Sequence, residues 1–196
     1  MKDIMDGVTI KNSAESFVSG TMPHLQSEYG DANNCTLVSI ATVIEHLLNE
    51  HTQSSYSFSE IYKNVLNGIK PKFAYSPKYG TISLFNKNIA ENVLESYLDG
   101  CNFTTQGNYI KGLGYDYELI KDVIDSGFPA YLYARKADKY KNHTMVIIGY
   151  REYMNVNKKW IRQLIVYDNW SKREKNIDYS SISFISMIGY IEKNIS

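Results

Sequence analysis

The stretch that decides the fold reads NNCTLVSIATVIEHLL and covers residues 33–48. A polar, turn-prone run ends at Cys35, and an apolar pattern with helical spacing begins there. Its apolar positions fall on one helix face, namely Leu37, Ile40, Ala41, Ile44, Leu47 and Leu48. The stretch therefore predicts a core helix that begins at Cys35, with Asp31, Asn33 and Asn34 as candidate N-caps.

A cysteine in the first turn of this helix has two interpretations. The unpaired N–H groups and the helix dipole favour an anion there, and such surroundings lower a thiol pKa from about 8.5 to roughly 3.5–7.5. The alternative is that Cys35 is a small buried apolar residue, as most free cysteines are. Residues further along the chain bear on this choice.

Composition predicts one globular domain. Of 196 residues, 43% are hydrophobic and 21% charged, which excludes wholesale disorder. Lys+Arg and Asp+Glu are equal at 21 each, so charge gives no support to a nucleic-acid partner. No apolar run reaches the ~20 residues needed to span a membrane. The N-terminus shows no signal peptide, so we expect a cytoplasmic protein, or an exported one whose signal segment is missing from this sequence.

The cysteines and histidines point to neither disulfides nor metal. Cys35 and Cys101 make no disulfide framework, and the four histidines lie outside zinc-binding spacings. We therefore expect no metal and no cofactor, and we expect Cys101 to be inert packing.

The pattern of elements predicts an α+β fold, with a helical N-terminal half packed on a C-terminal antiparallel sheet. An irregular arm is expected at 1–30, a helical half at 31–127 and a sheet half at 128–196, all in the single domain 1–196. After the Cys35 helix, we expect helices opening with a capping box at Ser57, then at 86–99 and 116–126, with a loop at 70–81. Strands are expected at 128–134, 144–151 and 162–168, with one or two more in 182–192.

His143 stands at the start of a strand that is apolar on both faces, which indicates a central strand covered on both sides. The loop at 152–159 is expected to join it to the next strand as an antiparallel hairpin. A bend centred between Asn155 and Val156 places His143 directly opposite Asp168. Thiol, imidazole and carboxylate are the parts of a Cys-His-Asp nucleophile system. Taken alone, His143 would more often be a packing or capping residue.

Several motifs in this order resemble a papain-like cysteine peptidase, most closely the C39-like group related to bacterial bacteriocin-processing peptidases. They are Cys35 opening an apolar helix, GFPAYL at 127–132, HTMVIIGY at 143–150 and IVYDNW at 165–170. The resemblance covers roughly residues 30–192 and implies an active-site cleft between a helical half and a sheet half. It also implies a peptide or protein substrate.

The resemblance assigns catalytic roles to three residues: Cys35 as nucleophile, His143 as base and Asp168 as orienting residue. Trp170 stands two positions after Asp168, like the tryptophan in papain's Asn-Ser-Trp, which favours Asp168 over Asn169.

Two positions depart from the family pattern. Thr36 replaces the glycine that usually follows the cysteine, and Tyr29 stands where the oxyanion-hole glutamine is usual. The substitutes that the sequence offers for this glutamine are Gln26, Asp31, Asn33, Asn34 and the Tyr29 hydroxyl. Three functions fit these observations: a thiol peptidase acting on peptide or isopeptide bonds, an acyltransferase on the same triad, and a catalytically impaired module that binds peptides or glycans.

Overall fold

The computed structural model describes residues 13–30, 33–51, 56–69, 75–76, 78–82, 86–97, 103–111, 116–137, 140–155 and 157–193. Cys101 and Asp31, which the sequence singled out, lie outside these residues. The elements in chain order are β1 (Ser13–Phe17), η1 (Gln26–Tyr29), α1 (Cys35–His51), α2 (Phe58–Ile69), β2 (Tyr75–Ser76), β3 (Gly80–Thr81), α3 (Asn86–Tyr97), β4 (Phe103–Ile110), α4 (Tyr117–Asp125), β5 (Ala130–Ala137), β6 (Lys141–Met154), β7 (Trp160–Tyr167), β8 (Glu174–Asp178), η5 (Tyr179–Ser181) and β9 (Met187–Lys193).

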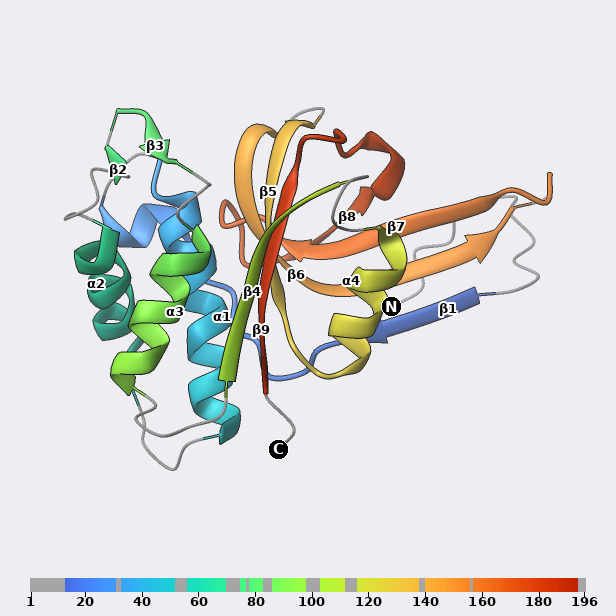
Figure 1. Ribbon diagram of the computed structural model, residues 1–196. Coiled ribbons are helices and arrows are strands. Elements are labelled where there is room, and N and C mark those ends of the chain that lie inside the picture. Colours follow the sequence, from blue (N-terminus) through green and yellow to red (C-terminus); the bar gives the residue numbers. More distant parts are fainter. Residues whose placement is uncertain are drawn as a thin grey trace.

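An antiparallel sheet of seven strands forms the centre of the molecule. Its order is β4-β9-β5-β6-β7-β8, and β1 pairs with β6 beside this path. The first part of the long strand β6 pairs with β5 and the second part with β1, while β7 runs along the other edge. Helices α1, α2 and α3 lie together on one side of the sheet (Figure 1). The predicted α+β class, with helices in the N-terminal half and an antiparallel sheet, is confirmed.

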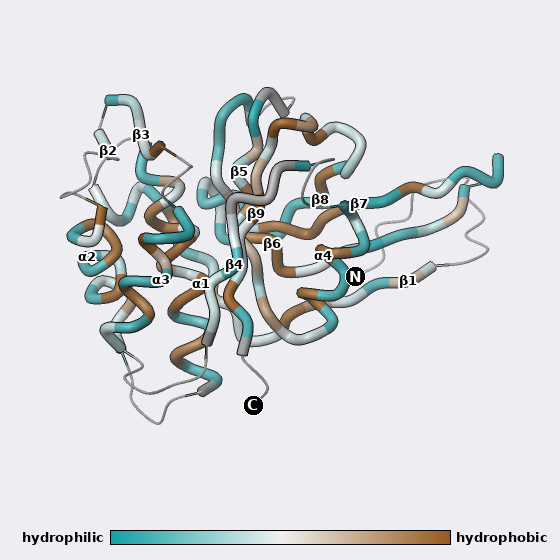
Figure 2. The backbone as a smooth tube through the Cα atoms, viewed as in Figure 1, coloured by the Kyte–Doolittle hydropathy of each residue, from teal (hydrophilic) through white to brown (hydrophobic). Residues whose placement is uncertain are grey.

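Two hydrophobic cores cover the two faces of the sheet. Val146 and Ile148 of β6 pack with α1–α3, whereas Met145 and Ile147 pack with α4 on the other face. This alternation confirms that the strand after His143 is central and covered on both sides. Figure 2 shows that the middle of the sheet is apolar and that the far end of the β6–β7 hairpin is hydrophilic.

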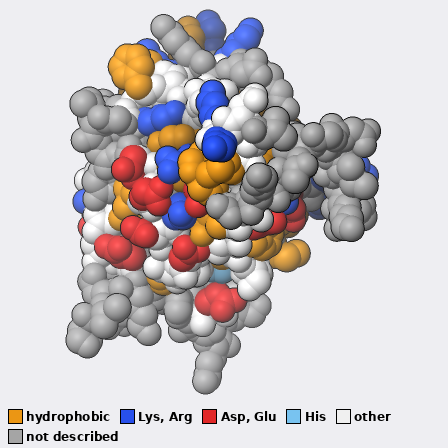
Figure 3. All heavy atoms as spheres, turned by 90° about the vertical axis from the view of Figure 1, so that its right-hand side faces the viewer, with side chains coloured by type: hydrophobic (Ala, Val, Ile, Leu, Met, Phe, Trp, Pro, Cys, Tyr) orange, Lys and Arg blue, Asp and Glu red, His pale blue; other side chains and the backbone are white. Residues whose placement is uncertain are grey.

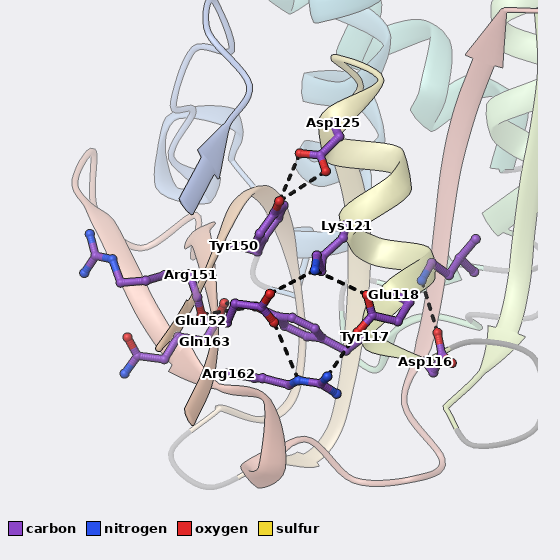
Figure 4. Close-up of polar contacts among 11 residues, drawn as sticks. Asp116, Tyr117, Glu118, Lys121, Asp125, Tyr150, Arg151, Glu152, Arg162 and Gln163 are labelled. Atoms are coloured by element: carbon purple, nitrogen blue, oxygen red, sulfur yellow. Dashed lines mark hydrogen bonds and ion pairs between the residues drawn. The ribbon is translucent and has the colours of Figure 1, made fainter. Parts of the chain in front are cut away.

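A closed ring of four alternating charges holds α4 against β6 and β7 (Figure 4). Lys121 contacts Glu118 and Glu152 at 3.3 and 2.9 Å, and Arg162 contacts the same two carboxylates at 3.0 and 3.8 Å. Beneath the ring, the Tyr117 hydroxyl donates to main-chain carbonyls of both strands. On this side of the molecule acidic, basic and apolar side chains are intermixed (Figure 3).

The predicted helices are found with small changes at their ends. The first begins at Cys35 as expected, although the Asn34 side chain does not cap it, because its amide donates to Gln26 and Tyr62 instead. The second follows Ser57, whose hydroxyl accepts the Glu60 N–H at 3.3 Å. The last is capped by Asp116.

Four strand features were not predicted: β4, β8, the small β2–β3 hairpin inside the expected loop at 70–81, and β1, which lies in the arm expected to be irregular and pairs with β6. Strand β4 lies in the stretch expected to be helical and pairs with β9 at one end of the sheet. The boundary between a helical half and a sheet half at residue 127 stays a prediction. Strand β4 precedes that residue and nevertheless belongs to the sheet.

Gly189 offers a test of how tightly the sheet packs. A Cβ atom there would overlap the ring of Tyr131, which is buried directly opposite Gly189 on the neighbouring strand β5. We expect Gly189→Ala to lower the free energy of unfolding by about 1–3 kcal/mol or more, measured by chemical denaturation.

Gly68→Ala is the matched control for this substitution. It lies in α2, where alanine favours helix and the nearest obstacle is a Val93 methyl group at 3.3 Å. Its effect should stay within about 1 kcal/mol. Equal losses in the two variants would contradict the close packing at Gly189.

Candidate active site

Cys35 sits at the tip of a helix that is enclosed by the rest of the protein. Every residue of α1 from Thr36 to Leu48 is buried, whereas Cys35 itself retains some exposure. A helix packed on all sides has little freedom to shift, because protein interiors are close-packed. The thiol is therefore presented at a fixed point where the helical layer meets the sheet.

His143, near the start of β6, lies beside this thiol. Burial raises the pKa of the Cys35 thiol, but a hydrogen bond with His143, the positive charge of His143 and hydrogen bonds with Thr144 lower it. Together they hold the pKa of Cys35 below its ordinary value. Because the thiolate is the nucleophilic form, this environment activates the sulfur. The structure thus brings together Cys35 and His143, which are far apart in the sequence.

The other side of the imidazole is fixed by main chain. His143 Nε2 lies 2.6 Å from the Asp168 carbonyl oxygen. A carbonyl oxygen only accepts hydrogen bonds, so Nε2 must carry the hydrogen. In the neutral imidazole this leaves Nδ1 as the proton acceptor.

The Asp168 carboxylate does not contact His143 as the sequence predicted. Its Oδ1 accepts the N–H groups of Trp170 and Ser171, both at 3.1 Å, and its Oδ2 accepts the Tyr140 hydroxyl at 3.4 Å. Burial, and then the Asp168 charge, raise the pKa of Tyr140 to about 12, so Tyr140 remains a donor. Asp168 therefore meets the histidine through its carbonyl oxygen while its carboxylate shapes the loop.

The predicted hairpin register was wrong, for two reasons. The β6–β7 ladder begins with Met154 opposite Trp160, so the bend lies further along the chain than expected. An irregularity between Ile147 and Gly149 then shifts the register again. The last pair is Val146 with Tyr167, and Asp168 follows the end of the strand.

Asn169, which the sequence analysis set aside, ties the two halves of the site together. Its amide nitrogen lies 2.7 Å from Ser39 Oγ, 3.1 Å from the Thr144 carbonyl and 3.4 Å from the Cys35 carbonyl. Its φ of 58° is a left-handed conformation that asparagine tolerates better than most residues. That tolerance was the only signal in the sequence that could have pointed to Asn169.

Gln26 stands out among the candidate oxyanion-hole donors. Its N–H donates to the Asn169 carbonyl at 3.0 Å, and its side-chain oxygen is buried without a hydrogen-bond partner. The Tyr29 ring instead packs against Phe58 and Tyr62. The remaining described candidates are engaged elsewhere, since Asn33 donates to the Lys78 carbonyl and Asn34 to Gln26 and Tyr62.

The segment that carries Gln26 is anchored on both sides. His24 Nε2 lies 2.6 Å from Glu45 Oε2 on α1, and the His24 ring stacks on Phe58 at 3.4 Å. Glu28 pairs with Lys172, in the loop between β7 and β8, at 3.0 Å. The N-terminal arm thereby connects the helical layer to the loops at the end of the sheet.

Two aromatic rings flank His143. Trp170 lies 4.2 Å from the imidazole, centroid to centroid, and Tyr140 stacks on both rings at 5.8 and 5.3 Å. Trp170 is half exposed, so one part of its indole remains open to solvent. The imidazole is consequently shielded and held in orientation by its neighbours.

Among the described residues, no three His, Cys, Asp or Glu side chains form a group that could hold a metal ion. Within that same part of the chain, no helix has the length and apolar character to cross a membrane.

Comparison with known proteins gives a family match. A sequence model of the Peptidase_C39 like family matches residues 20–190. No curated protein matches the chain. Among solved structures, similarity is found to SERA5E from Plasmodium falciparum, with a TM-score of 0.41 and 12% identity over 92% of this chain and 93% of that one. A second SERA5E crystal structure, with one loop ordered, gives a TM-score of 0.35 at 12% identity, covering 92% and 94%.

The thiol environment leads to a prediction about alkylation. Iodoacetamide near pH 6.5 should modify Cys35 ahead of Cys101, because His143 stabilises the Cys35 thiolate. In His143→Ala the rate at Cys35 should fall at least about tenfold at this pH, since one pKa unit changes the thiolate fraction by that factor. Peptide mass spectrometry measures the extent of alkylation at both cysteines. Faster modification of Cys101, or an unchanged rate in His143→Ala, would refute the assignment.

Proposed function

The chain belongs to the Peptidase_C39 like family, and from this premise we propose that it is a cysteine peptidase that cleaves peptide or isopeptide bonds. The observation that carries the proposal is that Cys35, at the start of the buried helix α1, lies against the start of β6, where His143 lowers the pKa of the thiol. A thiol beside an imidazole can act as a nucleophile on a carbonyl carbon, because the imidazole can take the thiol proton.

The proposed reaction begins with proton transfer from the Cys35 thiol to His143 Nδ1. The thiolate attacks the carbonyl carbon of the substrate, and the imidazolium returns the proton to the departing amine nitrogen. This leaves an acyl group on the Cys35 sulfur. Water, deprotonated by His143, then attacks the thioester, releasing the carboxylic acid and restoring the thiol.

Asp168 is proposed as the orienting residue of the triad, acting through its main-chain oxygen. The 2.6 Å contact with His143 Nε2 keeps the hydrogen on that nitrogen and leaves Nδ1 to face the thiol. A carbonyl dipole stabilises an imidazolium less than a full negative charge does, but the Asp168 carboxylate belongs to the same residue and adds charge nearby.

Gln26 is proposed as the side-chain donor of the oxyanion hole, together with the Cys35 N–H. The observation that supports this choice is its position: the Gln26 main-chain N–H donates to the Asn169 carbonyl, and the Asn169 amide nitrogen in turn bonds the Cys35 carbonyl, so the Gln26 segment lies close to the nucleophile. The anchored arm fixes the donor before the charge develops, which is the condition for effective stabilisation.

The proposed function is tested by cleavage of a complex peptide mixture. Incubation should generate new peptide termini that Cys35→Ala abolishes, while casein is digested slowly, because Tyr29 and Thr36 replace the glutamine and glycine that are usual in the family. Mass spectrometry of the termini supplies the readout. Cleavage that persists in Cys35→Ala would refute the proposal, and so would a wild-type protein that is alkylated at Cys35 yet yields no new terminus.

Removal of the proposed oxyanion-hole donor should slow peptide cleavage without changing the reactivity of the Cys35 thiol. Gln26→Ala should lower kcat by about 10²–10³ on a peptide identified in that experiment, as the loss of one donor does elsewhere. Its alkylation rate at Cys35 should stay within about twofold of the wild type. Tyr29→Phe is the control and should retain activity, since the Tyr29 ring is packed between α2 residues. Loss of turnover in Tyr29→Phe with full activity in Gln26→Ala would reverse the assignment.

A further inference from the structure

Asn169 lies where the helix of the nucleophile meets the strand of the histidine. It directly follows Asp168 in the loop after β7 and is 1% exposed. Its side-chain nitrogen lies 2.7 Å from Ser39 Oγ of α1 and 3.1 Å from the Thr144 carbonyl oxygen of β6. The Cys35 carbonyl oxygen is a third and longer contact at 3.4 Å. One side chain thus contacts both elements that carry the proposed reacting groups.

The neighbours of this amide determine which of its two ends faces them. Carbonyl oxygens only accept hydrogen bonds, so the NH₂ group and not the oxygen must point toward Cys35 and Thr144. That group carries two hydrogens, and its two shortest contacts are Ser39 on α1 and Thr144 on β6. The amide therefore bridges the helix and the strand with one hydrogen bond to each.

The main chain of Asn169 holds a third segment. Its carbonyl oxygen accepts the N–H of Gln26, in the N-terminal arm, at 3.0 Å. Its φ of 58° is a left-handed conformation, which asparagine, aspartate and glycine tolerate better than most residues. Neither glycine nor an ionised aspartate has a side-chain N–H group to donate. Asparagine meets both requirements, the backbone conformation and the donor.

We propose that Asn169 is a positioning residue, whose side-chain amide holds the start of α1, and with it Cys35, in place beside His143 on β6. Its main chain holds the Gln26 segment at the same point. The inference rests on the proposed function in taking Cys35 as the nucleophile and His143 as its base. It gives the loop after β7 two separate tasks, since Asp168 contacts the imidazole and Asn169 contacts the helix that carries the thiol.

Other contacts between α1 and β6 should keep the fold intact when the amide is lost. The hydroxyl oxygens of Thr36 and Thr144 lie 2.7 Å apart across the same boundary, and α1 is buried along residues 36–48. Loss of the amide is therefore expected to displace the first turn of α1 locally. A displacement of about 1 Å can cost about 10²-fold in rate where two reacting groups must be aligned.

The amide carries no charge, so a neutral replacement leaves the charges around the thiol unchanged. Among the described residues, the titratable groups near Cys35 are His143 of β6 and, beyond its ring, Asp168 and Tyr140. The first turn of α1 carries no acidic residue. A change of thiol reactivity in a neutral variant at position 169 therefore reports how well the thiol and the imidazole are aligned.

The test measures the pH dependence of Cys35 alkylation by iodoacetamide. Asn169→Gly removes the amide and leaves the left-handed backbone unstrained, so that only side-chain contacts are lost. The midpoint of the pH–rate profile should rise by about one pH unit, because a displaced thiolate is stabilised less by His143.

Ser39→Ala removes the hydrogen-bond acceptor on α1 and leaves Asn169 in place. Its midpoint should rise by less than that of Asn169→Gly, and the double variant should shift no further than Asn169→Gly alone, because Ser39 acts through the amide. Thr42→Val is the matched control, since Thr42 is buried in the same helix and its hydroxyl donates to the Val38 carbonyl at 2.8 Å. It loses a buried hydroxyl group away from Asn169, so its midpoint should equal that of the wild type.

A purely structural Asn169 would lower thermal stability in Asn169→Gly without moving the midpoint, and that result would overturn the proposal. Equal shifts in Ser39→Ala and Thr42→Val would do the same. If Asn169→Gly does not fold, Ser39→Ala against Thr42→Val carries the same test. The profile requires no substrate turnover, so an absence of peptide cleavage by the wild type would refute the proposed function while leaving this result interpretable.

Discussion

The rest of the structure depends on how the first turn of α1 is fixed against the start of β6. The Asn169 amide nitrogen lies within hydrogen-bonding distance of the Cys35 carbonyl, Ser39 and the Thr144 carbonyl. The hydroxyl groups of Thr36 and Thr144 form a further hydrogen bond between α1 and β6. All of these contacts are buried or nearly so, where an unsatisfied polar group would be costly. The position of Cys35 relative to His143 is therefore set by the packing of α1 on β6 and by Asp168 and Asn169, in the loop after β7, which bond to both elements.

Much of the fold was predictable because its central elements are strongly apolar. The helix at Cys35 and the strand after His143 carry patterns that only burial explains, and both were found where predicted. Strands β4 and β8 were missed because they lie at the two ends of the sheet path and read TTQGNYI and EKNID in large part, with few of the apolar residues that signal a strand. Their pairing is decided by partners distant in the chain.

The sequence predicted which residues make up the candidate site better than it predicted which atoms of those residues contact one another. That Cys35 and His143 would meet was implied by the resemblance to papain-like cysteine peptidases, whereas the contact of residue 168 with His143 depended on a register that the sequence leaves open. The bend is fixed by Asn155, whose side chain accepts two N–H groups, and by Lys158 with a φ of 58°. Neither this local turn chemistry nor the irregularity at Ile148 can be recognised from the periodicity of apolar residues in the sequence. The arm carrying Gln26 was likewise invisible to periodicity, since polar contacts anchor it.

The order of the strands has a consequence for a chain that is still being synthesised. The sequence places Cys35 early and His143 108 residues later, and β9 lies between β4 and β5 in the finished sheet although it follows both in the chain. Pairings between distant segments form late, because the intervening chain must first be brought together. At about 5–20 residues per second, a ribosome exposes the Cys35 helix several seconds or more before His143 is made. A nascent chain thus holds an ordinary thiol until β6 has been made and has packed against α1, because the groups that lower the pKa of Cys35 belong to β6.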